Sequence, residues 1–148
     1  MSDPSKPAWL SYPPFYEFLG PTLEVLADGR CEVSLAPRRE LGNSKGDLHG
    51  GAIASLFDLA MSQAVRSVYV AKGENINVST IGLTVNYLAP SKGTVRVIAQ
   101  ALRPGASIAY AEAEALNADG DSVARVSANY RIIRPKPGDG PKTIKAKP

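Results

Sequence analysis

Two groups that could act together on a carbonyl lie close to each other in the middle of the sequence. Gly50 and Gly51 open the apolar, helix-like stretch of residues 52–70, and Asp58 lies within it. The first backbone N–H groups of a helix lack helical partners and lie at its positive end, where glycine lets a polarised oxygen approach closely. A carboxylate among apolar neighbours is poorly solvated and is therefore a candidate base. Oxyanion donors beside a base predict acyl-transfer hydrolysis.

Three further polar residues are candidates for the same site, and each also has a structural interpretation. The Asn43 amide can hold a water molecule or a carbonyl oxygen, or it can shape a turn. The Thr80 hydroxyl can orient an attacking water, or the residue can be an ordinary β-branched member of a strand. For His49, the single histidine, we expect the ring to bond a nearby carbonyl or carboxylate, so Gly50 N–H is the better donor.

These residues, at this spacing, resemble the hotdog-fold acyl-CoA thioesterases of the phenylacetate-degradation branch. The shared pattern is Asn43, then the His-Gly-Gly triplet of residues 49–51, then Asp58 nine residues after the histidine, then Thr80 at the start of a strand. The resemblance covers residues 15–133. It implies an α+β hotdog fold, with an antiparallel sheet wrapped around one central helix. It also implies a dimer, or a dimer of dimers forming a homotetramer, with the active site at the subunit interface.

The resemblance implies hydrolysis of an acyl-CoA, with an aryl, short-chain or medium-chain acyl group, to a free acid and CoA. Asp58 would act as general base on water or as nucleophile through an anhydride, while Gly50 N–H and Asn43 polarise the thioester carbonyl. CoA is then part of the substrate, and no separate cofactor is expected. We expect His49 and Gly51 to contact the substrate. Candidate partners for the CoA phosphates are the loop bases Arg38, Arg39, Lys45, Lys92 and Arg103.

A function of a different class remains open, namely a non-catalytic acyl-CoA-binding or sensing protein on the same fold. The presence of Asp58 favours the enzyme. Helix geometry adds a constraint on that enzyme. Eight residues separate Gly50 from Asp58, which is about 12 Å along a helix axis, too far for both to touch one carbon. If both act on one carbonyl, Asp58 must come from a second chain whose helix is antiparallel across a two-fold axis.

Alternating apolar and polar residues predict strands on both sides of the helix. Short turns between the last four predict that these strands follow one another as an antiparallel meander. The helix is apolar nearly all round apart from one stripe of polar residues, so we expect the sheet to wrap around it. The predicted strands are residues 30–35, 80–87, 95–101, 108–116 and 123–133, and the polar stripe is Ser55, Asp58, Ser62 and Arg66.

Both ends of the chain differ from the predicted domain, which we place at residues 1–133 within the 148-residue chain. Residues 1–22 form an aromatic N-terminal extension, for which we expect core packing or a subunit contact, with a lid or wall over an apolar acyl pocket as the functional alternative. The composition of residues 134–148 predicts a disordered basic tail. The aromatic residues of the extension are Trp9, Tyr12, Phe15, Tyr16 and Phe18.

Charge and composition exclude several other classes. The formal net charge is +3, but the tail carries five basic residues against one acid, which leaves −1 over residues 1–133 and argues against a nucleic-acid partner. With 44% hydrophobic and 21% charged residues and no apolar run of membrane-spanning length, we expect a cytoplasmic protein without a membrane partner. One cysteine and one histidine predict neither a disulfide nor a metal site.

Overall fold

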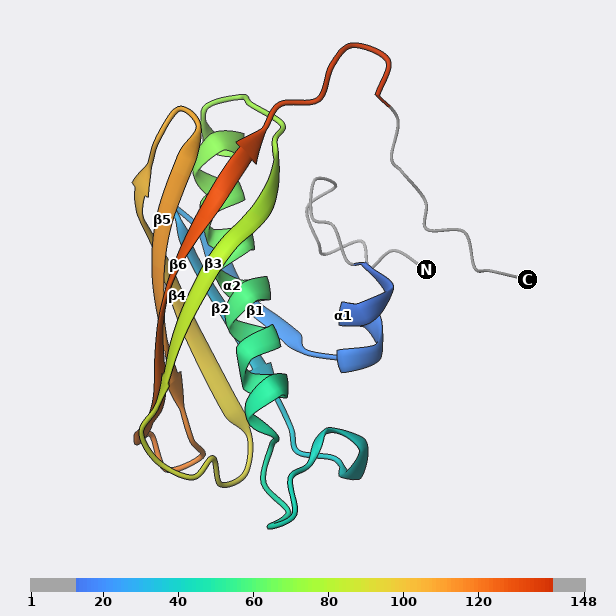
Figure 1. Cartoon of the computed structure of the whole chain (residues 1–148), viewed down its shortest axis with the longest axis vertical. Coiled ribbons are helices and arrows are strands. Elements are labelled where there is room, and N and C mark those ends of the chain that lie inside the picture. Colours follow the sequence, from blue (N-terminus) through green and yellow to red (C-terminus); the bar gives the residue numbers. More distant parts are fainter. Residues whose placement is uncertain (1–12, 140–148) are drawn as a thin grey trace, which may run out of the picture.

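The computed structural model describes residues 13–139, without the side chains of Val25 and Leu26, and consists of one long helix held by a curved sheet (Figure 1). All neighbouring strands are antiparallel, and the sheet order is β1-β2-β4-β5-β6-β3. The predicted α+β arrangement is therefore confirmed. The elements are α1 (Pro14–Leu19), β1 (Thr22–Ala27), β2 (Arg30–Leu35), the 3-10 turn η1 (Arg39–Leu41), α2 (Gly50–Ala71), β3 (Asn77–Tyr87), β4 (Val95–Pro104), β5 (Ile108–Leu116) and β6 (Ser122–Ile133).

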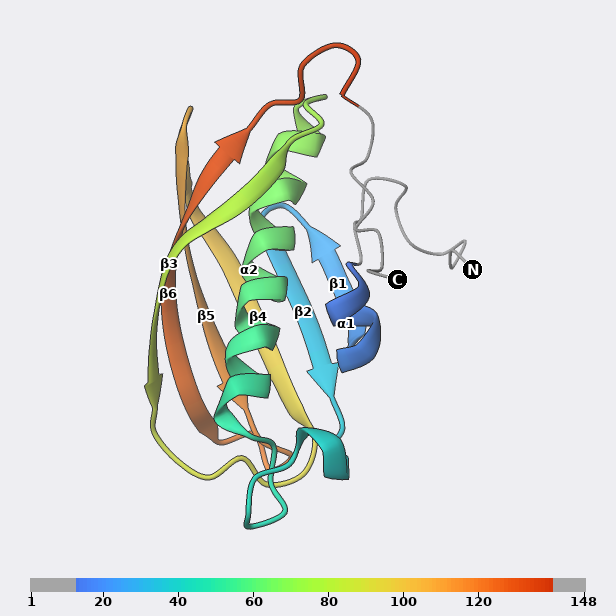
Figure 2. The same ribbon diagram turned by 45° about the vertical axis from the view of Figure 1, so that its right-hand side comes forward.

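Helix α2 fills the concave side of the sheet, so that β1 and β3 lie along its two sides (Figure 2). Its large apolar side chains, such as Leu56 and Phe57, are fully buried. Burying each such side chain contributes about 1.5–3 kcal/mol to folding. The facing side of β5 presents only alanines, which lets the sheet curve closely around the helix. These are Ala109, Ala111, Ala113 and Ala115, all buried.

One feature of the predicted topology is wrong. The strand that follows the helix, β3, was expected to pair with the next strand along the chain, but it pairs with β6 over nearly its whole length. The reason is that β4 already has two neighbours, β2 on one side and β5 on the other, and no edge remains for β3. Only β4, β5 and β6 form a meander. Residues 88–94 carry the chain across the end of the sheet, where Leu88 N–H donates to Val123 C=O at 2.8 Å.

Two elements that periodicity did not predict precede β2, namely α1 within the N-terminal extension and the edge strand β1 directly after it. Pro14 begins α1, and Gly20 ends it in a left-handed conformation with φ of 68°. The predicted burial of Trp9 and Tyr12 lies outside the described residues. At the other end, Arg134 is held by Glu74 and by the Ala106 carbonyl at 2.9 and 2.8 Å, so the chain is still fastened at this first tail residue. Within the described part of the chain, no helix is long and apolar enough to span a bilayer.

Candidate active site

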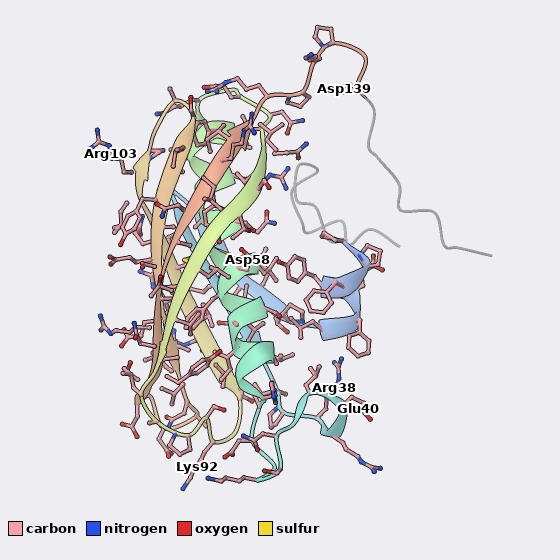
Figure 3. All side chains as sticks on the ribbon, viewed as in Figure 1. Arg38, Glu40, Asp58, Lys92, Arg103 and Asp139 are labelled. Atoms are coloured by element: carbon pink, nitrogen blue, oxygen red, sulfur yellow. The ribbon has the colours of Figure 1, made fainter. Side chains whose placement is uncertain are left out.

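Asp58 lies midway along the molecule, level with α1, and its carboxylate contacts three hydroxyl groups from three different elements (Figure 3). Thr80 of β3 donates to Oδ1 at 2.8 Å, and Tyr130 of β6 donates to the same oxygen at 2.9 Å. Tyr16 of α1 approaches the other oxygen, Oδ2, at 3.5 Å, the long limit of a hydrogen bond. The carboxylate is therefore oriented from the sheet side and more loosely covered from the α1 side.

The pairing of β3 with β6 explains why two hydroxyls reach one oxygen. Thr80 and Tyr130 are direct cross-strand partners, and the register shifts immediately after Thr80, at a bulge containing Ile81. Bulges of this kind redirect side chains next to active sites. Tyr130 is fully buried, and burial together with the negative charge of Asp58 raises its pKa far above the ordinary 10.0. Tyr130 therefore stays protonated and keeps donating its hydrogen bond.

The His-Gly-Gly triplet forms the N-terminus of α2. His49 is the N-cap residue, and its Nδ1 accepts a hydrogen bond from Gly51 N–H at 2.9 Å. A Cβ on Gly51 would lie 3.1 Å from that Nδ1, so glycine is what lets the ring sit there. The partner of the histidine ring is thus a backbone amide rather than the expected carbonyl or carboxylate. Gly51 N–H is used in this way, whereas Gly50 N–H has no acceptor among the described residues.

A tyrosine that sequence reasoning did not connect with the site packs on Gly50. Tyr87, the last residue of β3, donates its hydroxyl to Gly50 C=O at 2.5 Å. A Cβ on Gly50 would lie 3.2 Å from the Tyr87 ring, which is closer than side chains normally pack. Gly50 therefore permits this close approach, and the Tyr87 hydroxyl fixes the Gly50–Gly51 peptide, whose N–H donates to His49.

The Asn43 side chain shapes the loop before α2. Its Oδ1 accepts from Lys45 N–H at 2.9 Å and from Asp47 N–H at 3.2 Å, as in an Asx turn. The same Asn-x-x-Gly-Asp pattern recurs between β5 and β6, where Asn117 Oδ1 accepts from Asp119 and Asp121 N–H at 3.0 and 2.9 Å. The turn interpretation of Asn43 is therefore correct. It also fixes the amide, because an occupied Oδ1 leaves the Nδ2 group as the free donor.

The polar stripe of α2 divides into two parts. Ser55 and Ser62 are half-buried and bond the carbonyls of their own helix, and Asp58 lies between them. Arg66, at the far end, is buried and donates to the Ile76 carbonyl at 3.1 Å. The part of the stripe near Asp58 thus lies on the uncovered face of the helix, whereas Arg66 helps to pack the start of β3.

A cavity of about 270 Å³ lies between α1 and the first two turns of α2. Phe15 and Leu19 of α1 form one wall, and the other wall includes Gly51 and Ala52, next to Gly50. Helix α1 therefore borders a partly apolar space beside the candidate donor. Phe15 and Phe18 are 54% and 59% exposed, so these two rings are not in the core, and the subunit contact and the lid or wall stay predictions. The remaining lining residues are Glu40, Leu41, Gly42, His49 and Ser55.

The basic residues expected to bind phosphate do not gather in one place. Arg38 donates to the Phe18 and Leu19 carbonyls and lies over the Phe18 ring at 5.3 Å, so its guanidinium fastens the end of α1. Figure 3 shows Lys92 at the end of the molecule where α2 begins and Arg103 at the opposite end. These three residues cannot bind one group of phosphates within a single protomer. Within residues 13–139, no three His, Cys, Asp or Glu side chains are grouped to hold a metal ion.

Comparison with known proteins agrees with this fold and places the chain among hydrolases. Residues 5–132 match the family described as a domain of unknown function, DUF4442. A predicted esterase of Halobacterium salinarum is 34% identical over 126 residues, covering 79% of this chain and 83% of that protein. A thioesterase-family protein from Silicibacter pomeroyi superposes with a TM-score of 0.75 at 26% identity, covering 83% and 91% of the two chains. The E. coli PaaI protein of the phenylacetic acid degradation operon superposes with a TM-score of 0.70 at 22% identity, covering 79% and 82%. The predicted hotdog fold and thioesterase resemblance are confirmed.

Proposed function

The chain belongs to the DUF4442 family, and from that premise we propose that it hydrolyses an acyl-CoA to a free acid and CoA. Its thioesterase-family and esterase relatives support a hydrolase of the thioesterase type. The observation that carries the proposal is the Asp58 carboxylate. It lies on the uncovered face of the central helix and is oriented by the Thr80 and Tyr130 hydroxyls at 2.8 and 2.9 Å. An aspartate that only gave the helix a polar, solvent-facing surface would not need hydrogen bonds from two neighbouring strands.

The proposed reaction uses this carboxylate together with the start of α2. In the general-base route, Asp58 takes a proton from water as the water oxygen attacks the thioester carbon. Gly50 N–H and the Asn43 Nδ2 group hold the oxyanion, the C–S bond breaks, and the proton passes from Asp58 to the leaving thiolate. In the nucleophilic route, an Asp58 oxygen attacks the carbon, CoA leaves, and water hydrolyses the resulting anhydride.

The exposed edge of the sheet supports a dimer. Strand β3 has 11 residues and a free outer edge within the described residues, with no charged residue or proline to protect it. Long unprotected edges pair readily with another strand. Ile81 and Tyr87 along it are 59% and 52% exposed, which is unfavourable for a lone protomer. We expect a second copy of the chain to add its own β3 there across a two-fold axis.

The uncovered face of α2 suits the same arrangement. Gly51, Ala54, Ser55 and Asp58 form an accessible stripe of mostly small residues, over which a second helix can pass closely. Residue 54 is midway between Gly50 and Asp58. An antiparallel α2 that crosses near this point therefore brings Gly50 of one protomer opposite the carboxylate of the other. The two groups that act on one carbonyl then come from different chains, so their separation of about 12 Å along a single helix is no longer an obstacle.

The acyl group would occupy the cavity between α1 and α2, since its walls include Phe15 and Leu19 and it adjoins the start of α2. Aryl, short-chain and medium-chain acyl groups are the candidates. For the CoA phosphates, Lys92 lies at the end of the molecule where α2 begins, and Arg39 and Lys45 belong to the segment that leads into α2 (Figure 3). Arg38 is used by α1, and Arg103 lies at the opposite end.

A panel of acyl-CoA esters, assayed by release of free thiol, tests the proposal. The panel runs from acetyl-CoA to octanoyl-CoA and includes benzoyl-CoA and phenylacetyl-CoA, with matched oxygen esters as a second arm. We expect thiol release that depends on Asp58 and a preference within the panel. Binding of acyl-CoA by calorimetry without any turnover would instead favour the sensing protein. Hydrolysis of oxygen esters alone would contradict the thioesterase assignment.

A further inference from the structure

We infer that Tyr130 is a positioning residue for the proposed reaction: its buried hydroxyl fixes Oδ1 of Asp58 and leaves Oδ2 as the oxygen that reacts. The inference rests on the proposed function, because it assigns separate roles to the two oxygens of the same carboxylate. Tyr130 lies 72 residues from Asp58 along the chain and meets it only through the fold.

The two carboxylate oxygens have different surroundings. Oδ1 accepts two short hydrogen bonds, from Tyr130 at 2.9 Å and from Thr80 at 2.8 Å. Oδ2 has only the Tyr16 hydroxyl, at 3.5 Å. Hydrogen bonds withdraw electron density from the oxygen that accepts them, so Oδ2 is the more basic and the less constrained of the two. It faces Tyr16 of α1 and not the two donors of the sheet.

The Tyr130 side chain is held in one position next to Asp58. Its side chain is fully buried, so the ring cannot rotate away from the carboxylate, and its hydroxyl also lies 3.3 Å from the Asp58 carbonyl. The hydroxyl therefore contacts both the main chain and the side chain of one residue. Thr80, in contrast, lies at the sheet edge and is exposed. Tyr130 accordingly sets the position of the carboxylate, and Thr80 adds a second donor to the same atom.

Removal of one hydroxyl tests this role, since Tyr130→Phe keeps the buried ring. We expect kcat for the best acyl-CoA to fall about tenfold or more, with KM within about twofold, because the support acts on the reacting group and not on substrate binding. The matched control is Tyr69→Phe, because Tyr69 is also a buried tyrosine of the core, but its hydroxyl bonds Gly105 C=O. That variant should lower the melting temperature without changing kcat. Equal kcat values for Tyr130→Phe and wild type would overturn the inference.

A second measurement does not depend on turnover. The fall in melting temperature caused by Tyr130→Phe is measured in the wild type and in an Asp58→Ala background, and we expect a clearly smaller fall in the latter. Equal falls would show that the hydroxyl does not hold the carboxylate and would overturn the inference. If Tyr130→Phe does not fold, Tyr130→Met replaces it in both measurements with Tyr69→Met as its control, because methionine also removes the hydroxyl and adapts to an irregular buried space. If the wild type hydrolyses no acyl-CoA, the proposed function fails. The comparison of melting temperatures still shows whether the Tyr130 hydroxyl holds the Asp58 carboxylate.

Discussion

A single carboxylate carries the proposed chemistry, so Asp58 gives the most direct test at the level of one residue. Asp58→Asn keeps the size of the side chain and an oxygen that can accept from Thr80 and Tyr130, but it removes the base and nucleophile. We expect turnover to fall by about 10²–10⁴-fold while the fold is kept. Thiol release measures the loss, and circular dichroism with a melting curve checks the fold. Wild-type turnover in a well-folded variant would show that the site is elsewhere.

Asn43 tests whether a turn residue also acts as a donor, and Asn117 provides the control. Both residues close the same five-residue turn with two hydrogen bonds to Oδ1. Replacing either with Ala should cost similar stability, about 1 kcal/mol. Only Asn43→Ala should lose turnover, by about a hundredfold, because Asn43 belongs to the loop that leads into α2, whereas Asn117 joins β5 to β6. Kinetics and melting curves on both variants separate the two effects. Equal turnover in both variants would leave Asn43 as a turn residue alone.

The candidate site could be predicted from the sequence only where its members lie close along the chain or match the resemblance. Gly50 and Asp58 share one helix, so their spacing was informative, and Thr80 was expected beside them from the family pattern. Tyr130 contacts the carboxylate from 72 residues away, and a buried tyrosine in a strand has the same periodicity as any core residue. The donors that orient the carboxylate depend on strand order, which periodicity does not specify.

Helix α1 is fastened at its last residues by one side chain, that of Arg38. Arg38 binds two of its last carbonyls and stacks on Phe18, so Arg38→Ala should release it and lower stability by about 1–2 kcal/mol. Arg38→Lys keeps the charge but loses the planar fork and the stacking, and should lose nearly as much. Thermal melting measures both variants. If Arg38 binds CoA phosphate instead, Lys should restore a normal, salt-dependent KM and neither variant should melt earlier.

Strand order also explains why the fold was predicted more completely than its topology. Alternation of apolar and polar residues located β2 and the four strands after α2. Strands β2, β4, β5 and β6 bury one face against the helix, whereas β3 has no fully buried residue in one protomer. The same alternation is present whether β3 pairs with β4 or with β6. The choice is made by the edges that other strands leave free, which is a property of the whole sheet. The elements α1 and β1 were missed because each has only six residues, too few for a clear periodic pattern.

At the level of the whole molecule, buried proton donors predict a loss of stability at alkaline pH. Burial, with a smaller effect of the Glu32 charge, raises the pKa of Cys31 from 9.0 to about 12. Below pH 9.0 the thiol is protonated in both the folded and unfolded states, so its contribution is fully present. As pH rises from 9.0 toward 12, only the unfolded chain releases the proton, and the free energy of unfolding falls by about 1.4 kcal/mol per pH unit.

Melting temperatures measured from pH 7 to 10 check this expectation. The Cys31→Ala variant starts from a lower stability because of the lost volume, but it should lose less of it between pH 9 and 10 than the wild type. Above pH 10.0 the half-buried hydroxyl of Tyr16 and the buried hydroxyl of Tyr130, whose pKa values are also raised, should add to the loss in both proteins. Parallel curves for the two proteins between pH 9 and 10 would exclude Cys31 as the cause.

The shared active site is a property of the assembly, and mixed subunits test it. An Asp58→Ala subunit retains its own donors, and an Asn43→Ala subunit retains its own carboxylate, so each homodimer has two damaged sites. In a mixed dimer across the two-fold axis, one site combines both changes and the other has neither. After complete random exchange of equal amounts, half of the dimers are mixed and each has one intact site of two, so thiol release should recover toward about a quarter of the wild-type value. Mixing either variant with itself gives the baseline, and tagged subunits show by co-purification that exchange has taken place. Verified exchange without recovered activity, or an active monomer by light scattering, would mean that Gly50 and Asp58 do not act on one carbonyl across an interface.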